Sequence, residues 1–327
     1  MIGGLIFPVI LLSLIIGDIQ KKVFGNSMMS GNVDKTEFDP LIITDRGTGK
    51  KYYGGDQDWY KSNTQAFAGC GSVACANMLR TLAFKYPDRF NDKDVSEDLR
   101  ALTGSECYKD EFISFMGSIY KSMLVFELPV VRKIYDMCKR GSKLFKGPVM
   151  PSYGMGAGGF IRGSLRFCKS RGLMLHMHSL LTAFCSYDKG LEFIKEGLDK
   201  CGSVVMLTSL NRHPLKLYSG KSGRLENGYD SKNGVRSHFM TITGIEEDEQ
   251  GKPLIKLSTW GRVATVPYEK LNRSWHLSRA YTSCLYYMTP AGSEAVVRAD
   301  MRNAAGMFFK ALFRGLFGRF IRGSKLN

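Results

Sequence analysis

Apolar residues recur along the chain with two different periods, and the change of period divides the chain into two parts. Between residues 72 and 200, apolar positions recur at the spacing of three and four that is typical of amphipathic helices. This spacing predicts helices over residues 72–86, 111–123, 130–138, 159–171 and 189–200. After residue 202, short runs rich in β-branched and aromatic residues predict strands over 204–210, 238–245, 254–259, 263–266 and 281–288. The first half is therefore predicted to be mostly α and the second half mostly β.

Turn and linker residues set the limits of the folded part. Residues 41–44 and 50–53 resemble two short strands, and the glycine-bearing turn at 45–49 predicts that they form a hairpin. Upstream, residues 26–38 are rich in Gly, Ser, Asn and acidic side chains, which indicates a linker. The polar stretch 219–237 indicates a loop between two strands. We expect one folded domain over residues 39–290.

The first 25 residues are predicted to form a hydrophobic membrane anchor. Residues 2–17 contain no charge, and Lys21 and Lys22 follow them. If this segment inserts, the two lysines favour a cytoplasmic location for the domain that follows. A secretory signal is disfavoured, because no basic residue precedes the apolar run and no small-residue cleavage site follows it. The alternatives are a buried first helix or a start codon placed too early.

Residues 291–327 are predicted to contain a basic amphipathic helix. Phe309, Phe313 and Phe317 fall on one helical face, whereas Lys310 and Arg314 fall on the opposite face. A helix of this kind lies on an anionic lipid surface, with its apolar face buried among the lipids. We therefore expect membrane association, and the alternative is docking of the apolar face on the folded domain.

Composition narrows the classes of protein further. The 327 residues carry a net charge of +16, which favours acidic partners, but no stripe of basic residues interleaved with aromatics supports nucleic-acid binding. The eight cysteines lie singly, mostly in apolar runs, and none forms a Cys-x-x-Cys pair. Buried reduced thiols in a reducing compartment explain this pattern better than a disulfide framework or a zinc ribbon.

A cysteine between two glycines is the first candidate for catalysis. Cys70 lies between Gly69 and Gly71, directly before an apolar helical pattern. The positive end of a helix dipole favours a thiolate, and flanking glycines would let a substrate backbone come close. Gln65 could donate a side-chain N–H beside the Cys70 backbone N–H, which is the pair that an oxyanion hole needs. Cys75 is the alternative nucleophile, although its position within the helix fits packing better.

The β-rich half supplies a candidate base and its supports. His238 begins an otherwise apolar predicted strand, a position where a core histidine is uncommon. About twenty residues later another predicted strand ends in Ser258, Thr259, Trp260 and Gly261. A small polar residue can orient an imidazole and an indole can shield it, so we assign Ser258 the first role and Trp260 the second.

These motifs resemble those of the papain-like cysteine peptidases, and in particular the bacterial double-glycine leader peptidases that process bacteriocin precursors. Cys70 matches the nucleophile segment, His238 matches the base, and residues 258–261 (STWG) resemble the Asn-Ser-Trp-Gly segment of the family. Residues 53–59 (YGGDQDW) and 69–77 (GCGSVACAN) are also similar to papain-like proteins of gut Firmicutes. The resemblance covers roughly residues 50–288. Two departures are Ser258 in place of Asn or Asp, and Gln65 one residue closer to the nucleophile.

The resemblance implies an α+β fold of the papain-like cysteine peptidase type, with a helical N-terminal half packed on an antiparallel β-sheet C-terminal half. It implies a thiol hydrolase that cleaves peptide or amide bonds in a peptide or protein substrate, with Cys70, His238, Ser258 and Gln65 as catalytic residues. Gly69, Gly71, Trp260 and Gly261 would form or support the substrate groove. No cofactor is required. The same residues also serve acyltransferases, and the alternative is a binding protein on this fold, held at a membrane, that has lost its catalytic chemistry.

Two weaker motifs carry no functional assignment. Residues 153–159 (YGMGAGG) resemble a phosphate-binding loop only in their glycines, because no hydrophobic strand precedes them and no Lys-Ser/Thr pair follows. We expect a turn there. His176 and His178 alternate as strand residues do, and the sequence offers no third ligand beside them, so we expect no metal site.

Overall fold

The computed structural model describes residues 39–123, 125–140, 152–182, 185–209, 214–219, 223–224, 234–276 and 283–291. The predicted anchor over residues 1–25, the linker over 26–38 and the amphipathic helix with Phe309, Lys310, Phe313, Arg314 and Phe317 lie outside these ranges. Within these ranges, no helix has both the length and the apolar character needed to cross a membrane.

The described part opens with the predicted hairpin. Strands β1 (Ile42–Thr44) and β2 (Lys51–Tyr53) pair in the antiparallel sense. Asp45 closes the turn, because its carboxylate accepts hydrogen bonds from the backbone N–H groups of Gly47 and Thr48. The prediction of a hairpin is confirmed.

Each of the five predicted helices is present, with shifts of one or two residues at the ends. The observed helices are α3 (Cys70–Lys85), α6 (Lys109–Ser122), α7 (Pro129–Met137), α8 (Ala157–Lys169) and α9 (Tyr187–Cys201). Shorter elements that the periodicity did not predict are α2 (Asn63–Ala68), α4 (Pro87–Phe90), α5 (Glu97–Arg100), α10 (Tyr268–His276) and the 3-10 turns η2 (Gln57–Trp59) and η3 (Ala101–Thr103).

The main sheet is antiparallel throughout its described pairs, in the order β5-β12-β6-β9-β10-β11-β7-β8. Its strands are β5 (Leu175–Leu181), β6 (Val204–Thr208), β7 (Tyr218–Ser219), β8 (Gly223–Arg224), β9 (His238–Glu247), β10 (Pro253–Thr259), β11 (Arg262–Pro267) and β12 (Cys284–Pro290). A separate pair joins β3 (Val125–Glu127) to β4 (Ser152–Met155). All five predicted strands have counterparts in the main sheet.

The division into an α half and a β half needs a correction. The edge strand β5 precedes residue 202, whereas α10 lies between β11 and β12. β5 joins the sheet because it pairs along its whole length with β12, from the far end of the domain. The chain is therefore a mixed α and β protein with an antiparallel sheet, but its two halves interleave.

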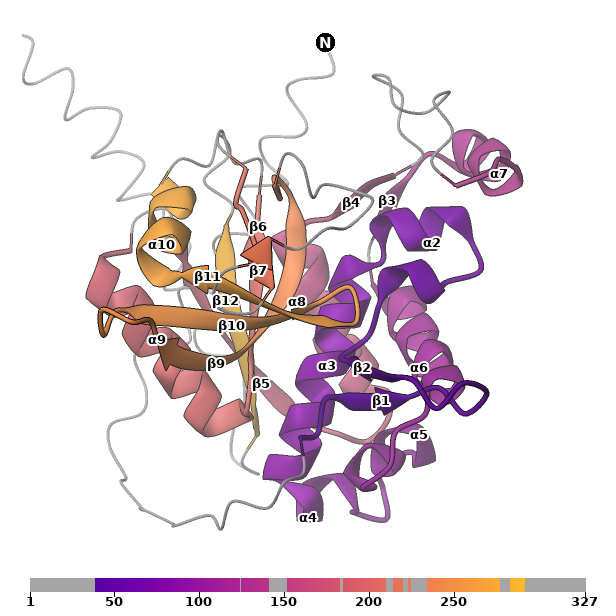
Figure 1. The fold of residues 1–327 in the computed structure, drawn as a ribbon. Helices are drawn as coiled ribbons and strands as arrows, with labels where there is room; N and C mark the ends of the chain where they lie inside the picture. The colour runs from indigo at the N-terminus through magenta and orange to yellow at the C-terminus, as the bar shows by residue number, and fades with distance from the viewer. Residues whose placement is uncertain are drawn as a thin grey trace, which may run out of the picture.

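Helix α3 lies at the centre, between the main sheet and α6, as Figure 1 shows. Every residue from Gly71 to Ala83 is buried, so this helix has no solvent face along most of its length. A helix that is apolar on all sides is stable only in such a position. Its N-terminus lies beside the start of β9, and this junction holds the candidate site.

Candidate active site

Cys70 is the first residue of α3 and is partly exposed. The backbone N–H groups of Phe239, Gly71 and Cys70 itself favour the ionised form of its sulfur. Burial raises the pKa of the thiol above its usual 9.0, and these three N–H groups act in the opposite direction without reversing the shift. The structure thus places the sulfur against the residue that follows His238. It holds the sulfur as a neutral thiol rather than as the thiolate that the helix dipole alone would favour.

The two glycines beside Cys70 are explained by packing. A Cβ on Gly69 would lie 2.4 Å from the carbonyl oxygen of Gln65 and 2.5 Å from the ring of Tyr60. A Cβ on Gly71 would lie 2.9 Å from the terminal methyl group of Met155. We expected these glycines to admit a substrate backbone, but the structure fills their free side with the protein's own residues.

His238 is the first residue of β9 and only 8% exposed. Its Nε2 lies 3.0 Å from Oγ1 of Thr259, and its ring stacks on the indole of Trp260 with centroids 4.6 Å apart and planes 12° apart. Burial lowers the pKa of this imidazole from 6.5 to about 4. The ring is therefore neutral near pH 7.

The residue that orients the imidazole is Thr259, and this corrects the assignment to Ser258. The Ser258 hydroxyl donates to the backbone carbonyl of Tyr53 at 2.8 Å and accepts from Nδ2 of Asn77 at 3.3 Å. Successive residues of a strand point to opposite faces, so Ser258 and Thr259 have different partners although they are adjacent. Ser258 is buried and lines the cavity from its position in β10.

Trp260 and Gly261 form the two-residue turn between β10 and β11, where Thr259 pairs with Arg262. Both have a positive φ, 49° at Trp260 and 68° at Gly261, which is the pattern of a type I′ hairpin turn. A tryptophan in this conformation costs about 1–2 kcal/mol. Because the turn directs the indole onto His238, the stacking contact helps to offset this cost. Trp260 thus shields the imidazole as the sequence predicts.

Gln57, rather than Gln65, is the glutamine that lines the cavity with Cys70. Gln65 lies within α2, where its backbone N–H bonds to the hydroxyl of Ser62, and it is absent from the cavity wall. Gln57 begins η2 and is 9% exposed, and its Oε1 has no hydrogen-bond partner. The sequence contained the signal, because the segment 53–59 that resembles papain-like proteins includes Gln57. Gln57 precedes Cys70 by thirteen residues, so the sequence alone did not indicate that the two residues lie in one cavity.

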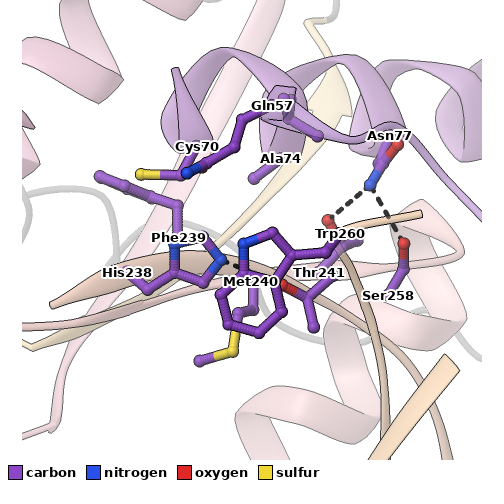
Figure 2. A pocket seen from close by; sticks show the side chains of 12 residues that line it. Gln57, Cys70, Ala74, Asn77, His238, Phe239, Met240, Thr241, Ser258 and Trp260 are labelled. Atoms are coloured by element: carbon purple, nitrogen blue, oxygen red, sulfur yellow. Dashed lines mark hydrogen bonds between the residues drawn. The ribbon is translucent and has the colours of Figure 1, made fainter. Parts of the chain in front are cut away.

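Residues of α3 and of the main sheet face each other across one small cavity (Figure 2). The sequence-predicted residues in its wall are Cys70, His238, Ser258 and Trp260, and those not predicted are Gln57, Val73, Ala74, Asn77, Phe239, Met240, Thr241 and Thr259. The free space holds about one water molecule. Cys75 is fully buried within α3 and is not part of the wall, so Cys70 is the cysteine that the fold brings to the imidazole.

The two weaker motifs lie in regular structure. Most of the glycine-rich stretch 153–159 belongs to β4 and the start of α8. His178 stacks on Tyr287 with centroids 4.4 Å apart, and its Nε2 lies 2.9 Å from Oγ1 of Thr289. Within the described ranges, no group of three or more His, Cys, Asp or Glu side chains is arranged to hold a metal ion.

No protein-family model matches the chain, and no curated protein sequence matches it. The chemistry of the site is therefore inferred from its own geometry.

Proposed function

We propose that this protein is a cysteine-dependent hydrolase that cleaves a peptide or amide bond through a covalent acyl-enzyme. The observation that carries the proposal is that Cys70, at the N-terminus of α3, and His238, at the start of β9, line the same small cavity. A partly exposed thiol at a helix N-terminus beside a neutral imidazole is the arrangement that nucleophilic catalysis by cysteine needs.

The hydrogen bond between Thr259 and Nε2 determines which nitrogen of His238 can act as the base. With Nε2–H donating to the Thr259 hydroxyl, Nδ1 is unprotonated and able to accept a proton. Because the resting pair is a neutral thiol and a neutral imidazole, the proton moves from sulfur to Nδ1 as the sulfur attacks.

In the first half of the reaction, the Cys70 sulfur forms a bond to the carbonyl carbon and Nδ1 of His238 takes the thiol proton. The imidazolium then gives this proton to the leaving nitrogen as the C–N bond breaks. In the second half, water attacks the thioester and loses a proton to Nδ1. The C–S bond breaks, the acid leaves, and the proton returns to the sulfur.

Gln57 and the backbone N–H of Cys70 are the proposed donors to the oxyanion. Both belong to residues in the cavity wall, and the side chain of Gln57 extends toward Cys70 in Figure 2. The unpartnered amide oxygen of Gln57 shows that its amide is not fully used within the protein. The oxyanion would accept its hydrogen bond from the Nε2–H of this amide, whereas the unpartnered Oε1 is itself an acceptor and would take a donor such as a substrate N–H.

Alkylation by iodoacetamide at pH 7, mapped by mass spectrometry, tests the proposal. We expect Cys70 to react, and we expect His238→Ala to slow this reaction about 10- to 100-fold, because general-base assistance contributes at least this much. Cys107 and Cys138 are also partly exposed and serve as internal controls whose labelling should not change.

The same experiment separates catalysis from its alternative. Equal labelling of Cys70 in the wild type and in His238→Ala would contradict the proposal. That result would favour a binding protein without catalytic chemistry. The small free volume of the cavity is the observation that favours this alternative, since only the cavity mouth is open to a ligand.

A further inference from the structure

Asn77 lies on the same face of α3 as Cys70, seven residues or about two helical turns further along. It is 1% exposed and forms part of the cavity wall. A buried primary amide must find partners for two donors and one acceptor, or pay for desolvation. The structure supplies partners for all three.

The amide of Asn77 joins α3 to three other segments. Its Oδ1 accepts a hydrogen bond from the backbone N–H of Gly55 at 3.0 Å. Its Nδ2 donates to the hydroxyl oxygens of Thr241 and Ser258, each at 3.3 Å, and Figure 2 draws both bonds. Thr241 and Ser258 form a cross-strand pair between β9 and β10, so one amide group binds both strands.

Each of these partners is a near neighbour in sequence of a proposed catalytic group. Gly55 precedes Gln57 by two residues, Thr241 follows His238 by three, and Ser258 precedes Thr259. The amide group of Asn77 therefore touches every segment that supplies the nucleophile's partners.

The segment that carries Gln57 is held in place from several sides. The Ser258 hydroxyl, which accepts a hydrogen bond from Asn77, donates one to the carbonyl of Tyr53. Gly261 bonds this segment twice, from its N–H to the Gly55 carbonyl at 3.1 Å and from its carbonyl to the Tyr53 N–H at 2.9 Å. Gly54 leaves the space that these contacts occupy, because a Cβ there would lie 2.1 Å from the Ser258 oxygen.

We propose that Asn77 is the positioning residue of this site, which fixes Cys70 on α3 relative to His238 and Gln57. The effect of Asn77 on catalysis rests on the proposed function. Asn77 does not touch the reacting atoms, and it acts through the distance between the helix and the two strands. A misplacement of about 1 Å is enough to slow such a reaction by about a hundredfold.

The test compares two variants of the full chain that each remove a buried hydrogen-bonding side chain from α3. Asn77→Ala removes the amide at the site. Thr81→Val removes the hydroxyl that lies 2.7 Å from Ser203, one helical turn further from Cys70. Both variants should lower the melting temperature, which provides the matched measure of structural damage.

We expect only Asn77→Ala to change the pH–rate profile of Cys70 alkylation by iodoacetamide. The rate at pH 7 should fall about tenfold or more. The midpoint should move to higher pH, toward that of a thiol without base assistance. NMR titration should show the His238 ring pKa rising from about 4 toward 6.5, because a loosened site admits water. Thr81→Val should keep the wild-type profile and titration.

The outcomes separate the two proposals. If both variants change the profile and the His238 titration equally, or neither does, Asn77 is only a structural residue and the inference is overturned. If His238→Ala leaves alkylation unchanged but Asn77→Ala still shifts the His238 titration selectively, the positioning role stands and the hydrolase proposal fails.

Discussion

At the scale of single residues, the hydroxyl of Thr259 is the hydrogen-bond partner of the His238 ring. A hydroxyl is a neutral partner, so it fixes the ring orientation without the charge that a carboxylate would place beside it. Burial then lowers the pKa of the ring to about 4 without opposition from a nearby anion. The imidazole therefore has an uncharged partner and is itself neutral near pH 7.

Gly54 is the backbone position on which the site depends most closely. Its φ is +75°, and a Cβ there would lie 2.1 Å from the Ser258 oxygen and 2.8 Å from Nδ2 of Asn77. We predict that Gly54→Ala lowers the free energy of unfolding by clearly more than the roughly 1–2 kcal/mol of the strained backbone alone. Urea denaturation measures this difference.

Gly49 supplies the control for this prediction. Its φ is +67°, but a Cβ there would have no atom within 4 Å. Gly49→Ala therefore reports the conformational cost without a clash. Equal destabilisation by the two variants would show that the space around Gly54 can relax and that its contacts do not constrain the site.

At the scale of elements, the short helix α2 has its own N-cap, Ser62, and α7 adds further contacts to this end of the helix. Asp136 of α7 accepts a hydrogen bond from the Thr64 N–H at 2.8 Å and another from the Ser62 hydroxyl at 2.9 Å. Asn63 donates to backbone carbonyls of α7 in return. Since α2 ends at the residue before Gly69, this contact helps to fix the segment that leads into Cys70.

We predict that Asp136→Asn destabilises the protein by about 0.3–1 kcal/mol at pH 7, because it removes a negative charge from the N-terminal end of α2. Burial raises the pKa of this carboxyl, but the hydrogen bonds from Thr64 and Ser62 outweigh burial and hold the pKa below 3.8. Its contribution is therefore present above pH 4 and is lost as pH falls through that lowered pKa. Urea denaturation at pH 7 and pH 3 measures both effects.

Asp88→Asn is the matched control, because Asp88 is an exposed acidic residue in the first turn of α4. It should change stability by a few tenths of a kcal/mol at most. If Asp136→Asn has the same small effect as Asp88→Asn, α2 does not depend on this contact with α7.

At the scale of the whole molecule, one buried and one half-buried imidazole make stability depend on pH. Burial lowers the pKa of both His238 and His178 from 6.5 to about 4. Between these values the unfolded chain binds protons that the folded protein does not, so stability decreases as pH falls from 6.5 to 4. The pKa shift of His238 corresponds to an upper limit of about 3 kcal/mol.

We predict that His178→Gln flattens the dependence of the unfolding free energy on pH between 4 and 6.5 to roughly half of the wild-type slope. Thermal or urea unfolding over this range provides the measurement. His276→Gln is the control, because His276 is exposed and lies at the end of α10. An unchanged slope in His178→Gln would show that His178 titrates alike in the folded and unfolded states.

Long elements with one dominant pattern could be predicted from the sequence, whereas elements defined by their neighbours could not. Helices α3, α6 and α9 and strands β9 and β10 agree with their hydrophobic periods. The strand β5 was missed as part of the sheet because its pairing partner β12 follows it by about a hundred residues. Helix α2 is only six residues long, and a contact with Asp136 of another helix supplements its own cap.

The sequence by itself determined which chemical groups this protein has and in which kind of element they lie. It placed Cys70 at the start of a helix, His238 at the start of a strand, and Trp260 with Gly261 at the end of another strand. These predictions need only local patterns, because backbone period and turn preference act over a few residues.

Only the tertiary structure decided which of these groups meet. It selected Gln57 over Gln65 as the glutamine of the cavity, and Thr259 over Ser258 as the partner of the imidazole. It also assigned Asn77, which no motif marked, to the centre of the contacts around the site. The physical reason is that hydrogen bonds depend on side-chain direction over a few ångströms. That direction is set by how strands pair and how a helix packs on them.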